Sequence, residues 1–148
     1  MTDQQGHTAA TNGAIFENII KRNICEVLDI SCLNHGEDPG LAKSVLWKNV
    51  PYESIYGTKC RSEFCLDLNG KRYRIECKFQ KTGGSVDEKL PYLMLNFTQQ
   101  VPEEETIIII DGPGFRDGAV KWLRQACEGT KCKVFSTVEF LVYLETLR

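Results

Sequence analysis

Two glutamates and a lysine in the stretch SEFCLDLNGKRYRIECKFQ, residues 62–80, have the types and spacing needed for chemistry on phosphate. Asn69-Gly70 predicts a two-residue type I′ turn between two strands. Counted from that turn, Glu63 faces Glu76 in a close, non-hydrogen-bonded pair whose Cα atoms lie about 4.5 Å apart. Like charges in this position repel each other, so a purely structural role does not account for the pair.

A divalent cation held between the two carboxylates would account for them. Mg²⁺ prefers oxygen ligands and is usually held by one or two carboxylates, waters and substrate phosphate oxygens. Without a cation, repulsion is expected to raise the pKa of one glutamate. Lys78 follows Glu76 by two residues and shares its face, where it can orient an attacking water or offset developing negative charge.

Side-chain alternation divides the hairpin into an apolar face, predicted to join the core, and a polar face, predicted to be a surface. The apolar face carries Phe64, Leu66, Leu68, Tyr73, Ile75 and Cys77, and the polar face carries Glu63, Cys65, Asp67, Arg72, Arg74, Glu76, Lys78 and Gln80. The competing interpretation of the polar face is a solvated surface of charge pairs such as Asp67 with Arg72.

Elements on both sides of the hairpin must position it. Periodicity, turn residues and capping signals predict their boundaries. The predicted elements are helices over 12–28 and 116–127, an extended segment over 45–56, strands over 106–111 and 133–136, and helices that begin at the capping boxes Ser85-x-x-Glu88 and Ser136-x-x-Glu139. This order predicts an α/β sandwich with a mixed central sheet flanked by helices.

The composition describes an ordinary globular chain of 148 residues with a net charge of −2. Residues 1–11 are expected to be a flexible lead and residues 12–148 a single domain. No apolar run approaches the ~20 residues of a membrane span, and the start lacks a signal-peptide core, so a cytoplasmic location is expected. Seven cysteines without a C-x-x-C pair predict reduced thiols and no structural zinc.

An acid on one strand and E-x-K on the next resembles the PD-(D/E)xK nuclease superfamily. The matching residues are Glu63 and Glu76-Cys77-Lys78, while Gly13-Ala-Ile-Phe-Glu17 is similar to the G-x-x-x-E pattern on the first helix of many members. Gln80 matches a glutamine that some members place after the lysine. The resemblance covers roughly residues 13–111, and it departs from the family pattern in having Glu63 where an aspartate is usual.

The resemblance implies a restriction-endonuclease-like three-layer sandwich and a Mg²⁺-dependent endonuclease, with Mn²⁺ able to substitute, that hydrolyses phosphodiester bonds in DNA. It implies metal binding by Glu63, Glu76, the Cys77 carbonyl and Glu17, with Lys78 and Gln80 orienting water or phosphate. Expected partners are DNA and further copies of the chain, as a homodimer or higher oligomer, in a prokaryotic or phage-infected cytoplasm. The candidates for substrate contact are Lys59, Arg61, Lys81 and Ser85.

Two alternatives stay open at this point. The modest overall charge also fits a non-catalytic nucleic-acid-binding or assembly protein on the same fold. A small-molecule enzyme that uses the loop Asp111-Gly-Pro-Gly is the other alternative, but no nucleophile and base can be named for it. The sequence does not choose between DNA and RNA, or among junctions, duplexes and single strands.

Overall fold

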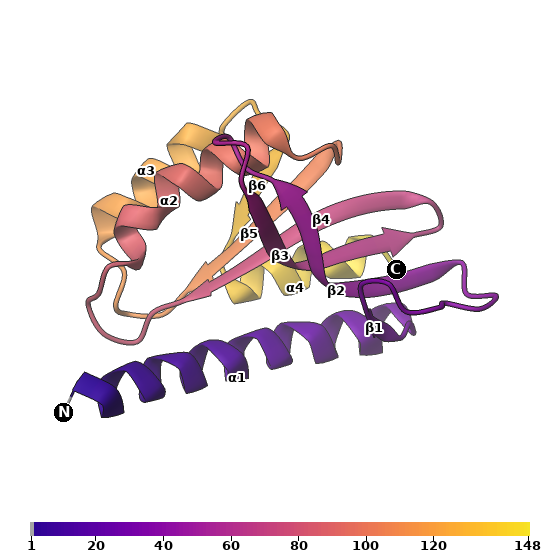
Figure 1. Cartoon of the computed structure of the whole chain (residues 1–148), viewed down its shortest axis with the longest axis horizontal. Helices are drawn as coiled ribbons and strands as arrows, with labels where there is room; N and C mark the ends of the chain where they lie inside the picture. The colour runs from indigo at the N-terminus through magenta and orange to yellow at the C-terminus, as the bar shows by residue number, and fades with distance from the viewer. Residues whose placement is uncertain (1) are drawn as a thin grey trace.

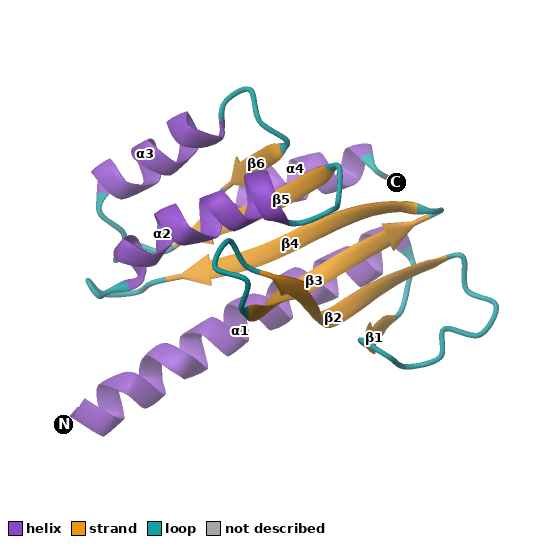
Figure 2. Ribbon diagram, turned by 45° about the horizontal axis from the view of Figure 1, so that its top comes forward, coloured by secondary structure: helices purple, strands orange, loops and turns teal. Residues whose placement is uncertain are grey.

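The computed structural model describes the backbone of residues 2–148 and the side chains of residues 11–148. In this range six strands form one mixed sheet in the order β1-β2-β3-β4-β5-β6 (Figures 1 and 2). The strands are β1 (Cys32–Asn34), β2 (Ser44–Glu53), β3 (Lys59–Leu68), β4 (Lys71–Phe79), β5 (Glu105–Asp111) and β6 (Cys132–Phe135). The helices are α1 (Thr2–Leu28), α2 (Val86–Leu95), α3 (Asp117–Cys127) and α4 (Thr137–Thr146), with a π-helical turn η1 (Asn96–Gln100) after α2.

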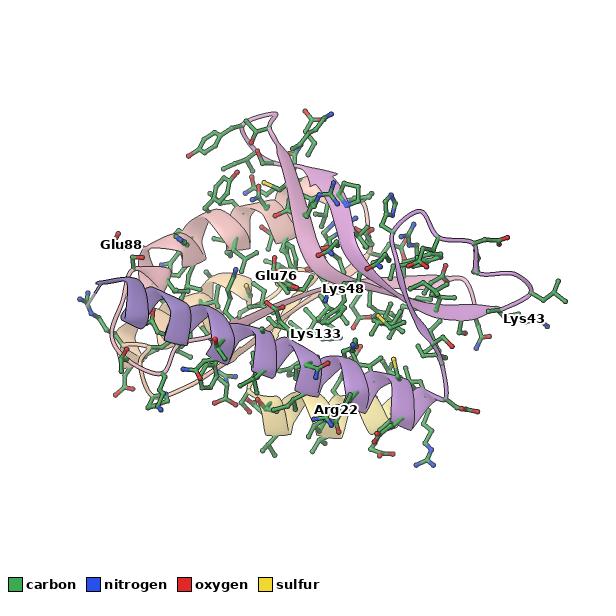
Figure 3. All side chains as sticks on the ribbon, turned by 60° about the horizontal axis from the view of Figure 1, so that its bottom comes forward. Arg22, Lys43, Lys48, Glu76, Glu88 and Lys133 are labelled. Carbon is green, nitrogen blue, oxygen red and sulfur yellow. The ribbon has the colours of Figure 1, made fainter. Side chains whose placement is uncertain are left out.

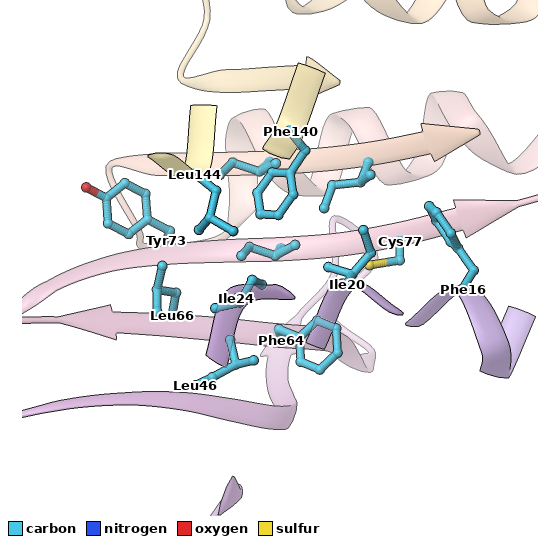
Figure 4. Close-up of a cluster of buried hydrophobic side chains, with 13 residues drawn as sticks. Phe16, Ile20, Ile24, Leu46, Phe64, Leu66, Tyr73, Cys77, Phe140 and Leu144 are labelled. Atoms are coloured by element: carbon cyan, nitrogen blue, oxygen red, sulfur yellow. The ribbon is translucent and has the colours of Figure 1, made fainter. Parts of the chain in front are cut away.

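The sheet is covered on both faces, which confirms the predicted three-layer α/β architecture. α1 and α4 pack on one face around Ile20, Ile24 and Phe140 (Figure 4). α2 and α3 pack on the other face around Leu90 and Leu123. The strands β2, β3 and β4 are antiparallel, whereas β4, β5 and β6 are parallel. β5 lies between β4 and β6 and is buried on both sides, as its β-branched sequence predicts.

The first helix is longer than the periodicity predicts. α1 begins at Thr2 rather than at Asn12. The apolar repeat starts only at Ile15, whereas the residues before it include Gln and Ala, which favour a helix without forming an apolar stripe. β1 and η1 were not predicted, because three to five residues carry too little periodic signal. No helix within residues 2–148 combines the length and the apolar character needed to cross a membrane.

The middle of the hairpin face predicted to be a polar surface is in fact buried, whereas Arg72 near the turn stays exposed. Cys65 has 0% of its surface exposed and Arg74 3%. The ends of β2 and β3, together with η1 and the segment before β5, cover this face, and Tyr52 packs edge-on against Phe97 at 6.2 Å between ring centroids. The prediction was wrong because alternation within a hairpin separates its two faces but does not reveal which later segments will cover each of them.

Charge pairing on this face also differs from the prediction. Asp67 lies opposite Arg72 as counted, but within residues 11–148 no ion pair joins them. Arg72 instead donates to the Sγ atom of Cys65 at 3.4 Å. The Oδ1 atom of Asp67 accepts the Gly70 amide at 3.3 Å and so belongs to the turn.

The two predicted capping boxes behave differently. Ser136 accepts the amide of Glu139 at 3.2 Å while Glu139 accepts the amide of Ser136 at 2.9 Å, so this box is confirmed. Ser85 begins α2 without a side-chain capping bond, so the prediction of a box there was wrong. We therefore expect Ser136→Ala to lower the free energy of unfolding by about 1 kcal/mol and Ser85→Ala to change it by only a few tenths. Urea unfolding of both variants tests this, and equal losses would contradict it.

Candidate active site

The two glutamates of the hairpin lie where β3 separates from β4. The predicted register is confirmed from the turn as far as the pair Phe64–Ile75. The predicted pair of Glu63 with Glu76 does not form: the ladder between β3 and β4 ends at Phe64–Ile75, while Glu76 continues along β5 opposite Ile108. β2 and β3 stay paired with each other beyond this point and bend away from β4 (Figures 1 and 2). The sheet therefore opens between the strands that carry the two acids.

A local backbone irregularity accompanies the bend. Asn49 has a φ of +57° and interrupts the ladder opposite Glu63, between two regular pairs. Asn is one of the few residue types that adopt this left-handed conformation readily. Glu63 has no partner on β4, and its backbone amide lies near enough to the Glu76 carboxylate to offset part of the rise in the pKa of Glu76 that burial causes. The two residues thus meet through amide and carboxylate rather than through the ladder.

Three glutamates from different elements meet at this opening. Glu17 of α1 shares a hydrogen bond with the Glu63 carboxylate, and burial, the charge of Glu63 and this bond raise the pKa of Glu17 to about 7. Burial is also the main reason why the pKa of Glu76 is raised to about 7, with the charges of Glu63 and Glu17 adding to it. At neutral pH the cluster therefore holds on to protons that ordinary glutamates have lost.

Two lysines lie beside the carboxylates. The charge of Lys78 opposes the pKa rise of both Glu76 and Glu17, so its ammonium group lies near both carboxylates. Lys48 of β2 also acts on Glu17, and the sequence reasoning missed it. Figure 3 shows Lys48 and Glu76 between α1 and the bent strands. Lys48 lies opposite Phe64, the residue that follows Glu63. This position is known only once β2 is paired with β3, so a search of the sequence alone could not find it.

An open pocket of about 480 Å³ adjoins the cluster on the side of α1. Glu17, Asn18 and Lys21 of α1 line it, together with Lys48 of β2 and Phe64 of β3. Two lysines and an amide in its lining make this pocket attractive to an anion such as a phosphate.

The donor set fits a hard divalent cation, although the carboxylates do not already form a metal site. Among residues 11–148, no three His, Cys, Asp or Glu side chains converge closely enough to hold a metal ion. However, Glu76 is only 6% exposed, and none of the ion pairs in this range includes it. A buried carboxylate beside two others is unfavourable because the negative charges repel one another. A bound cation would replace this repulsion by attraction.

Gln80 does not join the cluster. Its Nε2 atom donates to the carbonyl of Gly114 at 2.9 Å and to Asp87 at 3.3 Å, and its Oε1 atom accepts the amide of Val86 at 3.4 Å. These bonds tie the end of β4 to the start of α2 and to the turn after β5. The side chain that was predicted to orient water or phosphate is therefore used for positioning a loop.

The loop Asp111-Gly-Pro-Gly packs tightly against the end of β4. A Cβ atom on Gly112, whose φ is +109°, would lie 2.3 Å from the carbonyl oxygen of Gln80, and one on Gly114 would lie 2.4 Å from that of Thr82. The carboxylate of Asp111 accepts hydrogen bonds from Thr137 at the start of α4. These contacts give the two glycines and the aspartate a structural role. The Asp111 carboxylate is already hydrogen-bonded, so it is not free to act in catalysis.

The four residues predicted to contact substrate are all exposed, and they lie in two places. Lys59 and Arg61 lie on the bent part of β3, beyond Glu63. Lys81 and Ser85 lie in the loop between β4 and α2. Both places adjoin the elements that supply the glutamates, so these four residues stay candidates for contact with the substrate.

Comparison with known proteins identifies the family of this chain. The protein VC1899 from Vibrio cholerae, a solved structure, is similar with a TM-score of 0.47 and 16% identity, over 88% of this chain and 31% of that one. The chain thus spans about a third of the length of that protein. The comparison with curated proteins gave no match. The family model of the PD-(D/E)XK nuclease superfamily domain matches residues 8–146, nearly the whole chain. The protein therefore belongs to the PD-(D/E)XK nuclease superfamily.

Proposed function

We propose that the protein is a Mg²⁺-dependent endonuclease that hydrolyses phosphodiester bonds in DNA, with Mn²⁺ able to replace Mg²⁺. Membership of a nuclease superfamily supports phosphodiester hydrolysis. The observation that carries the proposal is the meeting of Glu17, Glu63 and Glu76 beside Lys78, with a buried Glu76 whose pKa is raised to about 7. A buried carboxylate beside two half-buried ones disfavours the folded protein unless a cation binds to them.

Glu63 and Glu76 would hold the cation, together with the backbone carbonyl of Cys77, and Glu17 would support the site from α1. Because the pKa of Glu17 is raised to about 7, its proton must leave before Glu17 can act as a ligand. When bound, Mg²⁺ supplies charge that polarises the phosphate and makes a coordinated water more acidic. The protein's part is to keep these oxygens close together in a partly buried opening.

Lys78 is assigned to the water and the phosphate. Its ammonium group lies close enough to the carboxylates to lower the pKa of Glu76 and Glu17. From that position it can donate a hydrogen bond to the attacking water and offset charge on the phosphate oxygens as the new P–O bond forms. Gln80 takes no part in this proposal because its amide is bonded to the loops after β4 and β5.

A plasmid-nicking assay tests the proposal. We expect the purified chain to nick supercoiled DNA in Mg²⁺ or Mn²⁺ and to be inactive in EDTA. Lys78→Met should lower the rate by about a hundredfold or more, because it removes a charge that acts on the transition state. Lys121→Met, at an exposed position in α3, is the matched control and should keep full activity. Full activity of Lys78→Met, with the variant folded by circular dichroism, would contradict the assignment.

The same assay defines the substrate. A panel of linear duplex, single strand, four-way junction and RNA separates DNA from RNA and one DNA structure from another. Because cutting both strands of a duplex takes two sites, we also propose a homodimer, and light scattering of the purified chain tests it. Absence of cleavage on every substrate, combined with binding to one of them, would favour a non-catalytic nucleic-acid-binding protein.

A further inference from the structure

Tyr56 presents an open aromatic ring at the tip of the β2–β3 hairpin. Its side chain is 75% exposed, and its ring stacks on that of Tyr92 in α2, with the centroids 5.3 Å apart and the planes 19° from parallel. Tyr92 covers one face of the ring, and the high exposure leaves the other face in solvent. A rigid aromatic with one free face is the kind of surface on which a nucleobase stacks.

The tip is held firmly in this shape. Ser54, with 0% of its surface exposed, bonds through its backbone to Thr58 at 2.8 Å and through its hydroxyl group to the Thr58 hydroxyl group at 2.7 Å. The amide of Tyr56 donates to the Ser54 hydroxyl group at 3.1 Å, and the amide of Ile55 donates to Asn96 of η1 at 2.9 Å. Because the tip is already ordered, a ligand that stacks on Tyr56 loses little affinity to ordering it.

The tip joins β2 to β3, the strand that supplies Glu63 of the carboxylate cluster, and the tip and the cluster share Tyr52 as an intermediate neighbour. The Tyr92 hydroxyl group lies 3.7 Å from the Sγ atom of Cys60. Cys60 is the strand partner of Tyr52, and both Cys60 and Glu76 act electrostatically on the Tyr52 hydroxyl group. Along the strand, Tyr56 and Glu63 are separated by at most about 23 Å at 3.3 Å per residue. A bound strand of several nucleotides would span that distance.

Three exposed basic residues lie on the two elements next to the platform formed by Tyr56 and Tyr92. Lys59 and Arg61 are exposed on β3, and Lys89 is exposed three residues before Tyr92 on α2. Glu53 lies opposite Lys59 and offsets part of its charge, whereas Arg61 lies opposite Pro51 and has no acid across from it. Cations beside a stacking ring suit a polyanion whose bases are accessible, which is a single strand rather than a closed duplex.

We infer that Tyr56, supported by Tyr92, is a binding site for an unpaired nucleobase, and that the substrate of the neighbouring site therefore includes a single-stranded segment. This inference rests on the proposed function for its biological meaning, but base stacking needs no metal and no cleavage. Binding can therefore be measured separately from catalysis.

The test is fluorescence anisotropy in EDTA, with a labelled oligothymidine of about 20 nucleotides and a blunt duplex of the same length as probes. Tyr56→Ala should weaken binding of the single strand about tenfold, the effect expected for loss of one stacked base. Tyr56→Phe should bind as the unchanged protein does, because stacking does not use the hydroxyl group. Trp122→Ala, which removes another partly exposed aromatic, on α3, is the matched control and should have no effect.

The outcomes separate this inference from the proposed function. Equal weakening of single-strand and duplex binding by Tyr56→Ala, no weakening, or no single-strand binding by the unchanged protein would each overturn the platform, even if Mg²⁺-dependent nicking is observed. If Tyr56→Ala selectively loses single-strand binding while the unchanged protein nicks no DNA, the result would support the platform and contradict the nuclease proposal. Thermal melting of Tyr56→Ala, expected to be unchanged at so exposed a position, shows that the variant is folded.

Discussion

Glu76→Gln is expected to abolish metal-dependent cleavage and, at the same time, to raise the melting temperature of the metal-free protein at pH 8. Loss of cleavage follows because an amide cannot replace a carboxylate as a ligand for Mg²⁺. The gain in stability follows because Glu76 is only 6% exposed and lies beside Glu63 and Glu17. The two effects have opposite signs, which is typical of a residue kept for function at the cost of stability.

The pH at which the gain appears follows from the raised pKa. Burial and the neighbouring acids hold the pKa of Glu76 at about 7 in the folded protein, against 4.5 for the ordinary group. The folded state therefore binds the proton more tightly, so ionisation of Glu76 destabilises the protein progressively as the pH rises from about 4.5 through 7. Fully ionised, it costs about 3 kcal/mol, from 1.36 kcal/mol per unit of pKa. Below pH 4.5 the neutral glutamate and the glutamine should be nearly equivalent.

Melting curves of both proteins at pH 5 and pH 8 in EDTA, together with nicking assays in Mg²⁺, measure these effects. Glu88→Gln, at an exposed position in the first turn of α2, is the control and should change neither property by much. A Glu76→Gln variant that still cuts DNA at the original rate would remove Glu76 from the proposed metal site. A variant that melts earlier at pH 8 would show that the carboxylate stabilises the fold instead.

Arg74→Ala should lower the free energy of unfolding by about 3–5 kcal/mol, the largest loss of stability expected from a single substitution considered for this chain. Arg74 bonds to both carboxylate oxygens of Glu103 at 2.7 and 2.9 Å, and each side chain is 4% exposed. It also donates to the carbonyl of Val50 at 3.1 Å and to the hydroxyl group of Ser62 at 3.0 Å. Alanine would leave Glu103 as a buried charge without its partner. It would also remove the hydrogen bonds that join Arg74 to Val50 of β2 and to Ser62 of β3.

Urea unfolding measures this loss. Arg124→Ala, which removes an exposed pair with Glu139 at 2.7 Å, is the control and should cost less than about 1 kcal/mol. Burial alone would raise the pKa of Glu103, but the hydrogen bonds and charge of Arg74 outweigh it and lower the pKa. The pair therefore stabilises the fold above the ordinary glutamate pKa, and this contribution disappears as the pH falls through the lowered value. Equal losses from the two substitutions would show that burial does not distinguish the pairs.

Much of the site could be predicted because its signals are local. Asn69-Gly70 fixes the turn, and the turn fixes the register as far as Phe64 and Ile75. The β-branched run of β5 and the capping box at Ser136 likewise act over a few neighbouring residues. The sequence thus determined the order of the main elements and the superfamily, whereas the roles of Glu63, Glu76 and Lys78 in the site stay a prediction.

Only the tertiary structure decided how these residues are surrounded. The bend at Asn49 ended the ladder before Glu63 and brought the Glu63 amide to the carboxylate of Glu76. Contacts between distant segments buried the second face of the hairpin, paired Arg74 with Glu103, and placed Lys48 beside Glu17. Burial and pairing of this kind depend on which segments pack together across the chain, and a short stretch of sequence carries no record of the segments that will cover it.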